Sequence, residues 1–88
     1  MALVNITELI VRETLNKILD EEYPDICRCD KCIDDMLAIV LNRLQPQYVS
    51  TPKGALFKRI DATLTQNVVD MKIVIVQAIE IVKSSPQH

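Results

Sequence analysis

Three cysteines, Cys27, Cys29 and Cys32, lie within six residues of one another and give the spacing C-x-C-x-x-C. Zinc in proteins takes four tetrahedral ligands and accepts thiolates readily, and cysteines two or three residues apart can wrap one ion from a short loop. The odd number of cysteines and their clustering argue against a disulfide framework. The spacing therefore predicts a metal site, with zinc as the first choice.

The motif supplies three ligands, so a fourth must come from elsewhere. The first candidate is His88, the only histidine, at the C-terminus. Asp30 or a water molecule are the alternatives for this position. An iron–sulfur cluster and three reduced thiols without metal also stay open. No second histidine or convincing general base accompanies the cysteines, so we expect the zinc to be structural.

The cysteine loop must be positioned by the helices on either side of it. Residues 6–22 carry apolar side chains at helical spacing, with Asn5 as N-cap and Glu8 placed to close a capping box. The predicted apolar line includes Val4 and Val11, and the residues before Pro24 end the helix. A second helix is predicted over residues 30–44, and its positive N-terminus favours thiolates in the loop before it.

Two further helices are expected in the second half of the chain. Thr51 and Pro52 begin a short helix over residues 52–61, whose predicted buried side is Leu56, Phe57 and Ile60. Thr63 and Gln66 read as a capping box for a last helix that reaches about residue 83. Its seam repeats every three or four residues and consists of Leu64, Val68, Met71, Ile75, Ala78 and Val82, with Val69, Val76 and Ile79 beside it.

A helix that is apolar around most of its circumference must be covered on most sides. Three other modest helices supply little cover in an 88-residue chain. We therefore predict an all-α, four-helix single domain over residues 1–88 that forms a homodimer through the long C-terminal helix. The alternative, in which this helix is central in a monomeric bundle, stays open.

Composition excludes several classes of protein. Almost half of the residues (49%) are hydrophobic and the net charge is −2, which disfavours a DNA-binding regulator or a polybasic membrane anchor. No targeting signal or membrane span is recognised, so a cytoplasmic protein is expected. The sequence contains no phosphate-loop motif, no nucleophile beside a base and no paired carboxylates with a histidine, so we do not expect an enzyme.

Motifs along nearly the whole chain combine in one pattern: Leu3-Val4-Asn5, the cysteine loop, Leu41-Asn42-Arg43-Leu44, Pro46, Tyr48-Val49, Lys53-Gly54 and the final helix with Pro86 and His88. In this combination the chain resembles the late competence ComFB family. The resemblance implies a helical, zinc-containing homodimer with no known catalytic activity, similar to regulators linked to competence and motility. Some relatives carry another cysteine near the C-terminus as a ligand, which makes His88 its natural substitute here.

Some members of this family act as receptors for cyclic dinucleotides, which implies a site for two phosphates and two bases. Arg43 offers a bidentate fork and Tyr48 an aromatic face, while Thr51 caps a helix N-terminus suited to anions. The expected nucleotide-binding set, for cyclic di-AMP or cyclic di-GMP, is Asn42, Arg43, Tyr48, Thr51, Lys53 and Gly54, with Lys58 and Arg59 about one turn later. The alternative is a structural module that binds only an unknown protein partner, with Tyr48 in the core and Arg43 in a surface ion pair.

Overall fold

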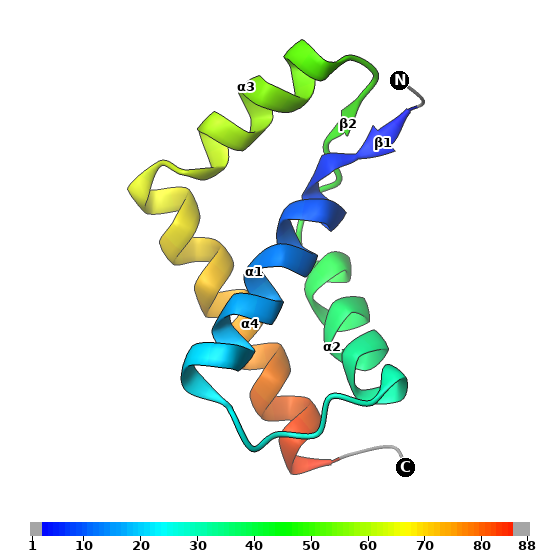
Figure 1. Ribbon diagram of the computed structural model, residues 1–88, viewed down its shortest axis with the longest axis vertical. Helices are drawn as coiled ribbons and strands as arrows, with labels where there is room; N and C mark the ends of the chain where they lie inside the picture. The colour runs from blue at the N-terminus through cyan, green and yellow to red at the C-terminus, as the bar shows by residue number, and fades with distance from the viewer. Residues whose placement is uncertain (1–2, 86–88) are drawn as a thin grey trace.

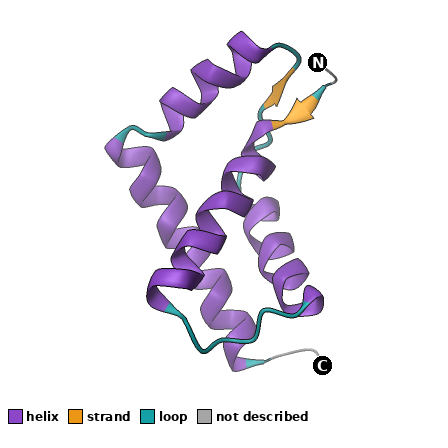
Figure 2. Cartoon of the chain, in the orientation of Figure 1, coloured by secondary structure: helices purple, strands orange, loops and turns teal. Residues whose placement is uncertain are grey.

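The computed structural model describes residues 3–85, which leaves the predicted ligand His88 outside the described residues. In chain order the described elements are β1 (Val4–Asn5), α1 (Ile6–Glu22), α2 (Asp30–Arg43), β2 (Tyr48–Val49), α3 (Pro52–Ala62) and α4 (Thr65–Ser84) (Figures 1 and 2). The predicted all-α fold with four helices is confirmed for this part of the chain. None of these four helices combines the length and apolar character needed to cross a bilayer.

The N-terminus of α1 is fixed by a side chain that serves two segments. The Asn5 Oδ1 accepts hydrogen bonds from the Thr7 amide (3.2 Å) and from the Gln47 amide (3.0 Å), which caps α1 and holds the β2 approach beside it. The predicted capping box is wrong, because Glu8 pairs with Arg12 one turn later (3.0 Å). Val4 also leaves the predicted helical line, since it lies in β1.

Strands β1 and β2 form a two-stranded antiparallel ladder in which Val4 faces Val49 and Asn5 faces Tyr48. The ladder lies at the end of the molecule opposite the cysteine loop (Figure 1). The sequence indicated only an extended connector at Tyr48, because a ladder of two residues leaves no periodic pattern. Its effect is to set the starting points of α1 and α3 side by side.

The core lies between α1, α2 and the C-terminal half of α4. Its side chains come from the lines predicted at helical spacing, and α2 packs most extensively against α4. Burial at these positions supplies the main stabilisation of the fold, at about 25 cal/mol per Å² of apolar surface. The fully buried large side chains are Val11, Leu15, Leu19, Met36, Val40, Ile75 and Ile79.

Helix α3 stands away from this core, and none of its described residues is buried. Figure 1 shows α3 and the first turns of α4 as two sides of a V that leans out from α1 and α2. The predicted buried side of α3 is wrong for the single chain, because Leu56, Phe57 and Ile60 are 57%, 59% and 53% exposed. The contacts of α3 with α1, α4 and β2 leave these side chains more than half exposed.

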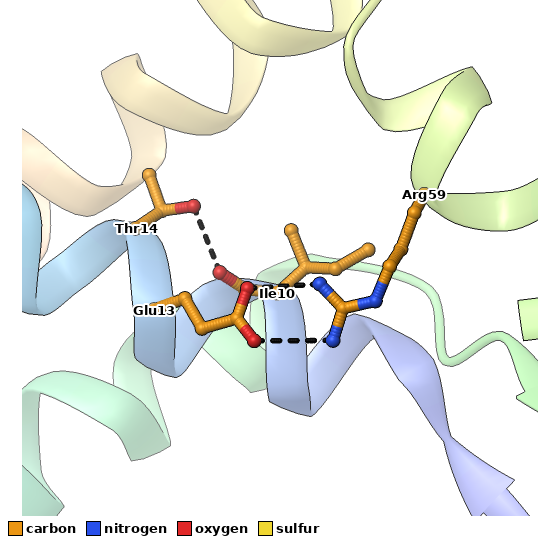
Figure 3. A network of polar contacts seen from close by, with 4 residues as sticks. All are labelled: Ile10, Glu13, Thr14 and Arg59. Carbon is orange, nitrogen blue, oxygen red and sulfur yellow. Dashed lines mark hydrogen bonds and ion pairs between the residues drawn. The ribbon is translucent and has the colours of Figure 1, made fainter. Parts of the chain in front are cut away.

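One ion pair ties the projecting helix back to the bundle. The Arg59 guanidinium on α3 binds both carboxylate oxygens of Glu13 on α1, at 2.9 and 3.1 Å. Figure 3 shows this fork next to Ile10 and Thr14, where the Thr14 hydroxyl donates to the Ile10 carbonyl (2.8 Å). Since both partners of the fork are solvent-exposed, it positions α3 more than it stabilises the domain.

The last helix is confirmed as a helix, and its β-branched run does not form a strand. The predicted cap at Thr63 is wrong, because its hydroxyl donates backward to the Ile60 carbonyl (2.6 Å) and ends α3. Helix α4 begins at Thr65, with Leu64 as an N-cap that makes no side-chain bond. The seam divides in two: its C-terminal members are in the core, whereas Leu64 and Val68 are 57% and 47% exposed.

Candidate metal centre

The loop that carries the cysteines joins α1 to α2 and passes the C-terminal end of α4 (Figure 1). Tyr23 anchors its beginning. The Tyr23 amide donates to the Leu19 carbonyl (3.1 Å) and ends α1, while its hydroxyl donates to Glu80 on α4 (3.0 Å). The Lys83 ammonium lies 5.9 Å from the centre of the Tyr23 ring. These contacts fix the loop against α4.

A second tether holds the loop between the first two cysteines. The Arg28 guanidinium lies 2.6 Å from the Asp20 carboxylate on α1. Farther along, the backbone turns into α2, where the Ile33 amide donates to the Cys29 carbonyl (3.0 Å). Sequence reasoning missed both Arg28 and Tyr23, although a cation between two cysteines that follow an acidic helix end was a usable signal.

The three cysteine sulfur atoms all lie within 4.8 Å of one another. With Zn–S bonds of about 2.3 Å, tetrahedral coordination separates neighbouring sulfur atoms by roughly 3.8 Å. Side-chain rotation is enough to close the difference. The predicted cysteine cluster is thus assembled by the fold, and it could hold a metal ion.

The environments of the Cys29 and Cys32 sulfur atoms shift their pKa values in opposite directions. Cys29 is the N-cap of α2, and its Sγ accepts a hydrogen bond from the Cys32 amide (3.4 Å). This bond, with a second from the Cys27 side chain, lowers the pKa of Cys29. Burial, followed by hydrogen bonding to Cys29, raises the pKa of Cys32 to about 12. Metal ligation requires thiolates, and a bound cation would offset the cost of deprotonating the buried Cys32 thiol.

A cavity of about 440 Å³ opens beside the cluster. Cys27 and Cys32 line it together with Met36 of α2 and with Val82 and Lys83 of α4. The cavity therefore joins the cysteine loop to the last turns of α4, from which the chain continues toward residue 88.

The predicted nucleotide-binding residues fall into two groups. Tyr48, Thr51, Lys53 and Gly54 lie on β2 and the first turn of α3, where the Thr51 hydroxyl oxygen accepts from the Gly54 amide (3.0 Å).

Asn42 and Arg43 form the second group, at the C-terminal end of α2, and both are exposed. The Arg43 guanidinium donates to Gln77 on α4 (3.2 Å). Tyr48 is 61% exposed, so it is not the core residue that the alternative interpretation required.

Comparisons with known proteins agree with this architecture. The family model of the late competence development protein ComFB matches residues 4–86. The competence protein ComFB of Bacillus subtilis (strain 168) is 29% identical over 84 residues, which cover 96% of this chain and 85% of that protein. A solved structure, a structural characterization of the late competence protein ComFB from Bacillus subtilis, superposes with a TM-score of 0.79. Its identity is 28%, with 97% of this chain and 94% of that chain covered. The chain belongs to the ComFB family.

Proposed function

We propose that this protein is a non-catalytic regulator of competence or motility that works as a zinc-stabilised homodimer and passes its signal to a protein partner. The observation that carries the proposal is the assembly of Cys27, Cys29 and Cys32 between three helices of a small core. Small domains bury little apolar surface and gain stability from a structural metal. The metal's contribution is charge neutralisation and cross-linking of thiolates.

His88 is the proposed fourth ligand. Val82 and Lys83, near the end of α4, line the same cavity as Cys27 and Cys32. His88 follows Ser85 by three residues, and an extended stretch of that length spans about 10 Å. An imidazole there would complete a three-cysteine, one-histidine zinc set, with Asp30 or water as the alternative ligand.

Elemental analysis of tag-free protein purified without added metal tests the zinc centre. We expect about one zinc per chain for the wild type and for Lys17→Ala, a control on the exposed side of α1. Cys29→Ser should lose most of the metal, and His88→Ala should bind it more weakly. Chelation should lower the thermal midpoint, because zinc binding and folding are linked. A wild-type content well below half an equivalent contradicts the proposal.

The homodimer is supported by an apolar surface that the single chain leaves uncovered. We call it the arm face; it consists of Leu56, Phe57, Ile60, Leu64, Val68, Val69 and Ile73, each between 47% and 59% exposed. So many exposed apolar side chains on two consecutive helices favour an interaction site. In a two-fold dimer the same patch of each chain packs against the patch of its partner, so both patches are buried by one interface.

A hollow on the outer side of α4 is a second feature that supports this interface. Val69, Ile73 and Val76 line a shallow, almost wholly apolar hollow of about 330 Å³, bordered by Lys72 and Gln77. Such a hollow accepts apolar side chains of a facing helix, while Lys72 at its border stays in water. Dimerisation through α4, with α3 alongside, is therefore the proposed assembly.

A cyclic dinucleotide is a second candidate ligand, supported by the exposed surface at the start of α3. The Tyr48 ring is available for stacking, and the Lys53 ammonium lies 5.9 Å from the exposed Phe57 ring. Pro52 has no N–H and the Gly54 amide is bonded to Thr51, so the positive end of the helix and the Lys53 amide are what α3 offers a phosphate. Arg43 is bonded to Gln77 and would have to turn from it to join this surface.

Calorimetric titration with cyclic di-AMP and cyclic di-GMP tests this ligand. Saturable binding of one of them should be weakened at least tenfold by Tyr48→Ala or Lys53→Ala and left unchanged by Lys17→Ala. If neither compound binds to folded dimer, the nucleotide hypothesis is wrong and the protein-interaction module is favoured.

A further inference from the structure

Cys29 and Cys32 stand in the relation that a disulfide needs. Cys29 is the N-cap of α2 and Cys32 lies one turn later, with their sulfur atoms within 4.8 Å. Residues three apart on a helical turn have Cβ atoms about 5–6 Å apart, and a disulfide requires about 3.5–4.5 Å. A small backbone adjustment at the extended N-cap residue closes this gap, and side-chain rotation then aligns the two sulfur atoms, without unwinding α2.

The two cysteines differ in how an oxidant can reach them. Cys29 is exposed at the helix N-terminus, with the Cys32 amide directed at its sulfur. Cys32 is only 2% exposed and packs against the core, but it also borders the 440 Å³ cavity, which gives its sulfur room to rotate. Cys29 is thus the attacking thiol, and Cys32 is the protected thiol that resolves the product.

Cys27 is a poorer partner for Cys29. Only Arg28 separates them, and the bond from Arg28 to Asp20 on α1 holds this part of the loop in place. A disulfide between residues two apart closes a small, strained ring, and the tether resists the backbone change that would relieve it. A disulfide between Cys29 and Cys32, three residues apart, avoids this ring strain.

We propose that Cys29 and Cys32 are an oxidative modification site, at which hydrogen peroxide forms a disulfide that displaces the metal. The Cys29 thiolate attacks one peroxide oxygen, the O–O bond breaks, and the sulfur is oxidised to a sulfenic acid as hydroxide leaves. The Cys32 sulfur then attacks the Cys29 sulfur and expels the hydroxyl group as water. In sum two thiols and one peroxide give one disulfide and two waters.

This inference rests on the proposed zinc centre, since two of its three thiolates are consumed in the step. Cys27 and the fourth ligand are then at most two ligands for an ion that takes four, so metal-bound and oxidised states exclude each other. Loss of the metal would loosen the loop that links α1, α2 and α4. A thiol reductant reverses the disulfide and restores the site.

Tryptic mapping of purified, zinc-loaded protein treated with hydrogen peroxide tests the proposal. Trypsin cleaves after Arg28 and Lys31, so each cysteine falls on its own peptide and every disulfide pairing is distinguishable. We expect a Cys29–Cys32 linked pair and release of about one zinc per chain, read with a colorimetric chelator. Cys27→Ser should still form this link, whereas Cys29→Ser should form none.

The outcomes separate the two proposals. The proposed Cys29–Cys32 disulfide is wrong if peroxide links Cys27, joins two chains or yields only sulfinic acid at Cys29. The zinc centre is still supported in that case if the untreated protein contains zinc. Protein that is isolated without zinc but forms the Cys29–Cys32 link contradicts the zinc centre and keeps the modification site. Retention of zinc after the disulfide has formed contradicts mutual exclusion.

Discussion

Replacing Ile73 by aspartate should separate the two protomers of the proposed dimer while each chain stays folded. Ile73 is the last residue of the arm face; it is 51% exposed on α4 and lines the apolar hollow between Val69 and Val76. Complete burial of such a side chain stabilises by about 1.5–3 kcal/mol, so covering its exposed half contributes about 1 kcal/mol per chain.

A two-fold interface contains the residue twice, which makes the apolar loss on substitution about 2 kcal/mol, or roughly 30-fold in the dissociation constant. An aspartate must also be desolvated in each copy, at a cost of several kcal/mol. We therefore expect at least a 100-fold weaker dimer, with little change in the monomer, where Ile73 faces solvent.

Sedimentation equilibrium over a range of concentrations measures this change, with circular dichroism to verify the fold. The matched control is Ile81→Asp, because Ile81 is on the same helix and 46% exposed but lies in the groove against α2, beside Ala38 and Ile39. Its dissociation constant should stay within a few-fold of the wild type. The reasoning is refuted if Ile73→Asp remains as tightly dimeric as the control, or if the wild type is monomeric.

Three further perturbations probe the fold. Met36→Ala, at a position with no exposure, should lower the free energy of unfolding by about 2–5 kcal/mol in chemical denaturation; the partly buried Met71→Ala should cost less than half as much. Thr51→Ala removes the α3 N-cap, worth about 1 kcal/mol, and hydrogen exchange should accelerate in α3 while amides of the core keep their protection. Arg59 lowers the pKa of Glu13 below its ordinary 4.5, so their pair stabilises the folded state above that pH and the effect is lost as the pH falls through the lowered value. Because both groups are exposed, Glu13→Gln should cost at most about 1 kcal/mol at neutral pH and flatten the acid limb of the stability curve; equal acid limbs for both proteins would contradict this.

The helices of the core were predictable because their signals are local. Asn5 and the residues before Pro24 delimit α1, and the predicted bounds of 6–22 agree with Ile6–Glu22. For α2 the predicted end at residue 44 is one residue late, since Leu44 is the C-cap and donates its amide to the Val40 carbonyl (3.1 Å). Caps and apolar spacing act within a few residues, so the sequence records them directly.

The predictions that failed concern side chains with competing partners and burial that depends on distant segments. Glu8 could close a capping box or pair with Arg12, and the structure has the Arg12 pair. The second bond of the Asn5 side chain, from the Gln47 amide 42 residues away, left no local signal. The apolar residues of α3 were expected to be buried, because helical spacing shows that a face must be covered but not whether the same chain covers it. The exposed Phe57 is the clearest example.

In the candidate site, too, the local features were predictable and the long-range contacts were not. The cysteine spacing is short, so a loop geometry that gathers Cys27, Cys29 and Cys32 was predictable. The nucleotide set required Arg43 and Lys53 to converge from different helices, and the Arg43 bond to α4 depends on how α2 and α4 cross. The role of Tyr23 likewise comes from its bond to Glu80, 57 residues away.

Native mass spectrometry of tag-free protein purified without added metal tests directly whether the protein is a zinc-bound homodimer. One spectrum reads the number of chains and the number of metal ions together. The account predicts a species of two chains and two zinc ions, which Cys29→Ser converts to a metal-poor form. A metal-free wild type, whether monomeric or dimeric, would contradict it.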